Sequence, residues 1–384
     1  MKRLLGASVP LGAALLAFVL GSIMILALGE NPISGASAIF EGAFGTGDRF
    51  AVTAVRATPL LLVGIGITIA FRASVINIGG EGQIIAGALL STIVALLVPD
   101  TPRIILIPLV MVAGMIGGGI WGAIPGALKA YASVNEILST VMLNIVAVQL
   151  MNFLLRGPMI DPIEKNGSRI PQTERLSDNA AMPTLVDGTR LHLGVVIAAL
   201  AAVAVYIILW RTPLGFRLRA VGHNPDAARA AGISVERNIT LAMAMSGALS
   251  GLAGVMLVFG SESLRLVTDG GAAGFTGSAG FNGIVAALFG GLHPLWTIPS
   301  SFLFGALLTG ATQLQRALQI PAALAVALNG LIVLFVVSSD RLRGWLDGRL
   351  NQGAFDNETA ELRESRNNST DQQSEAADPH NATP

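Results

Sequence analysis

The sequence predicts an all-α integral membrane protein with about ten transmembrane helices, and three observations support this. Only 12% of the 384 residues are charged and 52% are hydrophobic, whereas soluble domains carry about 25% charged residues. The hydrophobic residues form continuous runs, many long enough to cross roughly 30 Å of hydrocarbon. These runs are apolar on all sides, unlike soluble amphipathic helices, and they do not alternate as membrane β-strands do.

Ten apolar segments follow one another along the chain. The first comes after basic residues, as in a signal peptide, but its apolar run exceeds the roughly 7–15 residues usual there. We therefore interpret it as a retained helix. The last three are interrupted by glycines and by Pro294, Pro299 and Pro321. The segments cover residues 10–28, 51–71, 84–98, 104–128, 137–155, 193–210, 239–260, 275–291, 296–315 and 322–338.

Basic residues predict that both chain ends lie in the cytoplasm, because cytoplasmic loops are enriched in Lys and Arg. With this N-in, C-in orientation, the short outer loops hold Arg49, Arg103 and Arg265. The longer outer loop, 156–192, carries five basic and five acidic residues and weighs less in the rule. The inner segments hold Lys2, Arg3, Arg72, Lys129, Arg211, Arg217, Arg219, Arg229, Arg237, Arg341, Arg343 and Arg349.

Glycines recur every fourth residue in the fourth segment, and a second row of small residues lies in the seventh. Such rows allow helix backbones to approach closely in lipid, so they predict a tightly packed bundle. The first row is Gly114, Gly118, Gly122 and Gly126, and the second is Ser246, Ser250 and Gly254 with Gly247 and Gly251 beside it.

The chain divides into a transmembrane domain, 1–349, and a polar tail, 350–384. The tail has seven acids against two arginines, so the remaining 349 residues carry a net charge of +5. Because the tail lacks an aliphatic cluster, we expect it to be a disordered, acidic cytoplasmic segment.

No soluble catalytic site is expected. The four histidines lack metal-ligand spacing and cysteine is absent, so neither a metal site nor a catalytic residue is predicted. None of the three lysines belongs to a G-x-x-x-x-G-K-[ST] phosphate loop. The chain therefore requires no cofactor of its own, and ATP-driven transport would need a separate ATPase.

Two polar segments interrupt the apolar pattern in the first half. In NIGGEGQ, residues 77–83, glycines permit a broken backbone around Asn77, Glu81 and Gln83. Glu81 would either serve function at membrane depth or sit in the headgroup zone. In SVNEILSTVMLN, residues 133–144, Glu136, Ser139, Thr140 and Asn144 share one helical face. That face fits interhelical contact as well as a solute path.

Two further segments lie in the second half. The loop TPLGFRLRAVGHNPDAARAAGIS, residues 212–234, predicts a short helix that begins at Asn224-Pro225-Asp226 and ends at Gly232. An ordinary basic loop would explain its arginines but not this helix. The segment GFTGSAGFNGIVAALFGGLHP, residues 274–294, predicts an interrupted or re-entrant helix near Asn282. Helix packing alone explains its glycines equally well.

These four segments, in this order, resemble the permeases of bacterial ABC importers for simple sugars and nucleosides over about residues 55–340. The NIG-x-EGQ form and the long outer loop favour the nucleoside branch. The chain departs from the family at Ile84 and Ile85, where an alanine-rich run is usual, and in its tail.

The resemblance implies roles for two sets of residues. The first would form the loop whose short helix couples to the ATPase: Gly222, His223, Asn224, Pro225, Ala228 and Gly232. The second would line the translocation path or its gates: Asn77, Glu81, Gln83, Asn135, Glu136, Asn144 and Asn282.

The same resemblance implies the partners. They are an ABC ATPase that binds ATP-Mg, a second permease chain, homologous or identical, and an extracytoplasmic substrate-binding lipoprotein. Membrane lipid surrounds the bundle in the bacterial cell membrane, and no nucleic acid is expected. The alternatives within the ABC class are a simple-sugar permease and a branched-chain amino acid permease, whose segments differ mainly around residues 77–83. An ion-coupled secondary transporter fits less well, because it would place a coupling acid at mid-membrane, whereas Glu81 and Glu136 lie nearer the ends of their predicted spans. An intramembrane enzyme would need a catalytic dyad or metal set, which the sequence lacks.

Overall fold

A computed structural model describes residues 19, 22–27, 29–165, 167–319 and 330. The helices named below lie within the compact unit formed by residues 24–329. Within these described ranges, seven helices are long and apolar enough to cross a membrane. They are α3 (Gly47–Arg72), α4 (Gly80–Leu97), α5 (Arg103–Ala132), α6 (Glu136–Arg156), α8 (Gly194–Arg211), α11 (Val235–Phe259) and α14 (Pro294–Leu318).

The predicted eighth segment is interrupted. It consists of two short helices, α12 (Ala272–Thr276) and α13 (Ala279–Phe289). Gly277 and Ser278 separate them, both with φ of +60°. The carbonyl of Gly270, just before α12, accepts a hydrogen bond from Asn152 near the C-terminal end of α6, and the Leu292 carbonyl accepts one from Arg72 at the end of α3. The two pieces together therefore run between opposite ends of the bundle, as the prediction of a broken helix required.

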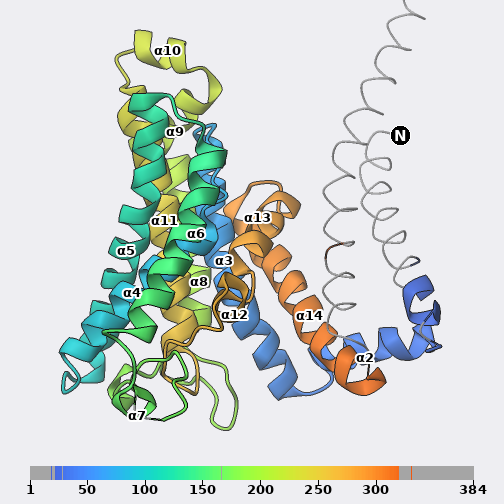
Figure 1. Ribbon diagram of the computed structural model, residues 1–384. Helices are drawn as coiled ribbons and strands as arrows, with labels where there is room; N and C mark the ends of the chain where they lie inside the picture. Colours follow the sequence, from blue (N-terminus) through green and yellow to red (C-terminus); the bar gives the residue numbers. More distant parts are fainter. Residues whose placement is uncertain (1–18, 20–21, 28, 166, 320–329, 331–384) are drawn as a thin grey trace, which may run out of the picture. The chain divides into compact units, whose positions relative to one another are not determined.

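Short helices mark the two ends of the bundle (Figure 1). One end carries α9 (Pro213–His223) and α10 (Pro225–Ala230), and is called here the α10 end. The other carries α7 (Pro162–Lys165), the 3-10 turn η1 (Asp178–Ala180) and the segment after α11, and is called the α7 end. The sequence predicted α10 but neither α9 nor α2 (Pro32–Phe44), which packs on α14.

Of the first predicted span, only residues 19 and 22–27 are described, and they are helical. The tenth span, 322–338, lies outside the described residues apart from Gly330, and so does the tail, 350–384. The described region therefore accounts for the predicted segments two to nine, with the eighth divided into two helices.

The two rows of small residues meet at the centre of the bundle. A methyl group on Gly118 of α5 would overlap the backbone of Gly247 and Gly251 on α11. One on Gly254 would overlap the Ile84 carbonyl of α4. Three helices therefore approach at backbone distance, which confirms the role of these rows in close helix contact.

The long segment 156–192, of which all residues except 166 are described, is held by contacts to other parts of the chain. It pairs with the chain after α11 through backbone bonds from Thr173 to Leu266 and from Leu176 to Leu264. An ion pair joins Asp161 to Arg265. Because the Arg265 guanidinium donates a hydrogen bond to this carboxylate, the pKa of Asp161 lies below its ordinary value. The segment thus forms a fixed cover at the α7 end.

Candidate functional site

A buried polar cluster lies where the connector between α3 and α4 meets α11. The Asn77 side chain donates to Gln83 Oε1 at 3.0 Å and to Ser246 Oγ at 2.8 Å. Its oxygen accepts from the Gly79 amide at 2.9 Å and from Gln83 Nε2 at 3.1 Å. Asn77 thereby closes the turn that begins α4, while the bond to Ser246 fixes that turn to α11.

Asn144 of α6 holds the same turn from the other side. Its oxygen accepts from the Gly82 amide at 2.8 Å, and its nitrogen donates to the Ile78 carbonyl at 3.0 Å. The amide of Gly82 lies in the first turn of α4, where backbone N–H groups have no partner within the helix. Asn144 therefore acts as a cap supplied by a neighbouring helix.

Glu81 connects α4 to the broken segment. The carboxylate is 2% exposed, and its Oε1 accepts from the backbone N–H of Phe281 at 3.2 Å. Ser278, at the N-cap position of α13, makes no side-chain cap, so Glu81 supplies the missing acceptor for that first turn. Its other oxygen has no hydrogen-bond partner among the described residues.

The remaining predicted path residues do not join these contacts. Asn135 caps α6 by accepting from Ile137 and Leu138. Glu136 forms an ion pair with Lys129 at 2.9 Å. Asn282 is half-buried, and its side chain makes no hydrogen bond to these residues within the described part of the chain. The predicted polar face of α6 is real, since Glu136, Ser139, Thr140 and Asn144 are all buried.

The α9–α10 segment forms an exposed surface at the other predicted site. Asn224 caps α10 by accepting from the amides of Asp226 and Ala227, both at 3.0 Å. Pro225 occupies the first helical position and Gly232, with φ of +79°, follows the helix end. Ala228 is buried against Val221 and Val235, whereas His223 is exposed. The sequence therefore located this helix correctly.

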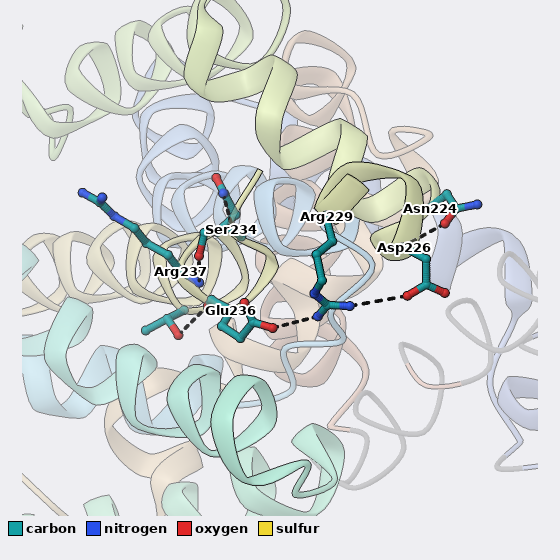
Figure 2. A network of polar contacts seen from close by, with 8 residues as sticks. Asn224, Asp226, Arg229, Ser234, Glu236 and Arg237 are labelled. Carbon is teal, nitrogen blue, oxygen red and sulfur yellow. Dashed lines mark hydrogen bonds and ion pairs between the residues drawn. The ribbon is translucent and has the colours of Figure 1, made fainter. Parts of the chain in front are cut away.

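Arg229 ties α10 to the start of α11 (Figure 2). Its guanidinium bonds to Asp226 at 3.4 Å and to Glu236 at 2.7 Å. The Glu236 hydrogen bond and its charge raise the pKa of Arg229, with a smaller contribution from Asp226. These groups are solvent-exposed, so we assign the network a role in orienting α10 rather than in overall stability.

Gly222 of α9 packs directly against the end of α3. The Ser74 hydroxyl donates to the Gly222 carbonyl at 2.6 Å. A methyl group on Gly222 would overlap the carbonyl oxygen of Arg72. Ser74 and Asn77 belong to the same short connector, residues 73–79. The α9–α10 segment therefore contacts the connector that carries Asn77 into the buried polar cluster.

An aromatic group supports this junction. Arg72 lies over the Trp210 ring at 5.2 Å and donates to the Leu292 carbonyl at 2.8 Å. His293 contacts both Trp210 and Tyr206. Burial, and secondarily the Arg72 charge, lowers the pKa of His293, so the neutral imidazole is favoured beside this arginine. The ends of α3 and α8 and the start of α14 are thereby joined.

The sequence did not predict the contacts of Ser74 and Arg72 or the hydrogen bond that Asn77 donates to Ser246. Ser246 stood out only as a small residue, and its partner is 169 residues away. Within the described part of the chain, no three His, Asp or Glu side chains are grouped to hold a metal. The arrangement connects the exposed helix α10, through direct contacts, to the buried polar turn at Asn77.

Known proteins share this sequence over most of its length. A family model described as branched-chain amino acid transport system / permease component matches residues 49–337. The guanosine ABC transporter permease protein NupP of Bacillus subtilis is 36% identical, over 89% of this chain and 96% of that protein. The nucleoside ABC transporter permease protein NupB of Lactococcus lactis is also 36% identical, over 85% and 90%.

A glucose ABC transporter permease protein of Haloferax volcanii is 32% identical, over 86% of this chain and 87% of that protein. No solved structure matches the chain. The apolar helices and these relatives place the protein in the membrane. Since the family model covers about three quarters of the sequence, the chain belongs to the family of permease components found in branched-chain amino acid transport systems.

Proposed function

We propose that this chain forms one half of the translocation path of an ATP-driven importer of nucleosides. The observation that carries the proposal is the α10 helix, which is exposed to a partner yet docked through Gly222 on the connector that leads to Asn77. A push on such a helix would be transmitted to the turn that begins α4. Because energy must enter from outside this chain, the partner is an ABC ATPase carrying ATP-Mg.

The remaining parts of the importer follow from that role. A second permease chain completes the path, and an extracytoplasmic lipoprotein delivers the solute. The α10 end faces the cytoplasm and the α7 end faces outward, with both chain termini inside. Asn77, Gln83 and Asn144 would shape the inner part of the path, and Glu81 would hold the broken helix beside it.

Nucleosides are preferred over sugars as the solute. Two relatives named for guanosine or nucleosides are each 36% identical, while the relative named for glucose is 32% identical. The polar groups of the cluster are uncharged amides and hydroxyls apart from Glu81, which suits a neutral solute that must be released after it binds.

The test is uptake by cells that lack this chain. Labelled guanosine, adenosine, uridine, ribose and glucose are compared in parallel, with the chain restored or absent. We expect nucleoside uptake to depend on the chain, to be lost in the Gly222→Arg variant at equal membrane abundance, and to stop when ATP is depleted. Loss of sugar uptake alone would establish the sugar alternative. Uptake that survives ATP depletion with an intact proton gradient would contradict ATP-driven transport.

A further inference from the structure

A cavity of about 550 Å³ opens at the α7 end of the bundle. Its walls are formed by residues 52–59 of α3, by the last turn of α11 with residues 260–264 after it, and by residues of the segment 175–192. Small-molecule sites usually enclose roughly 300–1,000 Å³, so the space is of suitable size for a solute. It is separate from the Asn77 cluster, because its α3 residues belong to the opposite end of that helix.

His192, in the wall of this cavity, has an unpartnered donor. Its Nδ1 accepts from the Gly194 amide at 3.1 Å, which leaves the proton of the neutral ring on Nε2. Burial lowers the pKa of His192, so the neutral form is favoured. The residue is 2% exposed, and Nε2 has no partner within the described residues. A buried donor left unpaired is costly unless a ligand satisfies it.

Arg56 adds a cationic donor to the same wall. One terminal nitrogen donates to the Leu308 carbonyl at 2.8 Å and to Thr312 Oγ1 at 2.9 Å. No other nitrogen of this guanidinium has a protein partner in the described region. The other lining arginines are neutralised in ion pairs, Arg175 with Asp178 and Arg190 with Glu262.

We propose that this cavity is an outer solute site that holds an uncharged nucleoside, with His192 and Arg56 donating to acceptor atoms of its base. The assignment rests on the proposed function and adds a binding place ahead of the inner cluster. Two free donors match a base carbonyl, and Val52, Val55 and Met256 in the same wall offer an apolar surface to the ring.

The experiment measures binding of labelled inosine to the complete importer complex in lipid nanodiscs, without the binding lipoprotein. Two His192 variants separate structure from recognition. In His192→Asn the amide oxygen replaces Nδ1 and keeps the Gly194 bond, but the Nε2 donor is lost. In His192→Gln the amide nitrogen replaces Nε2 as a donor and the Gly194 bond is lost. We expect Asn to weaken inosine binding about tenfold, the equivalent of one hydrogen bond, and Gln to bind nearly as the wild type does.

A second pair of variants tests Arg56. Arg56→Met removes the free donor together with the bonds to α14, whereas Thr312→Val removes a bond to α14 only. We expect weakened inosine binding in the first variant and wild-type binding in the second. Purine riboside, which lacks the base carbonyl of inosine, is expected to bind more weakly than inosine to the wild type, and this difference is expected to be smaller in His192→Asn, where Arg56 alone still donates to the carbonyl.

Several results would overturn the assignment. Wild-type affinity in His192→Asn combined with weak binding in His192→Gln would make His192 a cap of α8 only. Tighter binding of inosine 5′-monophosphate than of inosine would identify an anion site. Absence of saturable binding by the wild-type complex would remove the outer site, while nucleoside uptake by cells would leave the proposed function standing. Absence of uptake as well would remove both.

Discussion

Asp161 is a carboxylate whose ionised form is held by Arg265 in the cover at the α7 end. Since its pKa is lowered in the folded protein, this pair contributes its full stabilisation above the ordinary carboxyl pKa of about 3.9 and loses it progressively as pH falls from there through the lowered folded-state pKa. We expect Asp161→Asn to lower the unfolding temperature at neutral pH and the difference from wild type to shrink as pH falls below about 4. Asp187→Asn, on an exposed residue of the same segment, is the control. An unchanged difference at low pH would contradict the role of the charge.

Glu81 is expected to act through the acceptor that it gives to the first turn of α13. Glu81→Gln retains an oxygen for the Phe281 amide, whereas Glu81→Leu leaves that buried N–H unpaired at a cost of about 1–3 kcal/mol. We expect Gln to retain most nucleoside uptake and Leu to lose it together with thermal stability in detergent. Loss of uptake in a stable Gln variant would show instead that transport requires the negative charge.

The sequence predicted the local roles of some candidate-site residues but not the long-range partners of others. Asn224, Pro225 and Gly232 act on neighbours along the chain, so their cap, first-turn and left-handed positions were readable locally. Asn77, Asn144 and Glu81 stood out as polar residues in apolar surroundings. Their partners could not be read, because Ser246 and Phe281 are brought to them only by the packing of distant helices.

At the level of helices, the contact between α5 and α11 depends on the absence of side chains. Gly118→Ala would place a methyl group into the α11 backbone, and neither helix can move without disturbing α4. At the adjacent Gly119, the nearest atom to such a methyl group lies at 3.4 Å. We expect Gly118→Ala to destabilise the protein by roughly 1–3 kcal/mol or more. Gly119→Ala should be neutral or slightly stabilising, because alanine favours helix by about 1 kcal/mol.

Thermal unfolding in detergent, followed by the loss of the monodisperse species, measures both glycine variants. The two variants carry the same Gly→Ala substitution at adjacent positions of α5. Equal stability of the two variants would contradict the backbone contact between α5 and α11.

The junction between α9 and the α3–α4 connector can be tested through Ser74. Ser74→Ala removes the bond to the Gly222 carbonyl. Ser133→Ala is a matched control, because Ser133 is also exposed and left-handed, with φ of +54° against +56° for Ser74, and its hydroxyl makes no hydrogen bond to the described residues. We expect Ser74→Ala to reduce solute transported per ATP hydrolysed in the reconstituted importer, without loss of expression. If both variants behave as the wild type, the hydroxyl plays no part in coupling.

Continuous apolarity made seven long helices predictable, since each is apolar along its length. The glycines of segment 274–294 predicted its interruption, and the break lies at Gly277 and Ser278, which adopt a left-handed conformation that ends a helix. The apolar pattern did not predict helices α2 and α9, because they are short and mixed in polarity. Each begins with an N-cap followed by proline, Asn31-Pro32 and Thr212-Pro213. Such a cap alone does not predict a helix, because a short helix also needs packing against a neighbouring helix.

For the whole molecule, the orientation in the membrane follows from the charges at the two ends. Arg72, Lys129, Arg211, Arg217 and Arg219 lie near the α10 end, whereas the α7 end carries balanced charges in segment 156–192. Positively charged residues favour the cytoplasmic side, so α10 should be accessible only from inside.

The natural absence of cysteine permits a direct test of orientation, since one introduced thiol is then the only reactive site. Ala230→Cys places it on exposed α10, and Asp187→Cys places it on the exposed cover at the α7 end. With a membrane-impermeant maleimide, we expect the Asp187 variant to be labelled in intact cells and the Ala230 variant only in inverted vesicles. The reverse pattern would place α10 outside, beyond reach of any cytoplasmic ATPase. Coupling through α10 would then be impossible, whatever solute the protein carries.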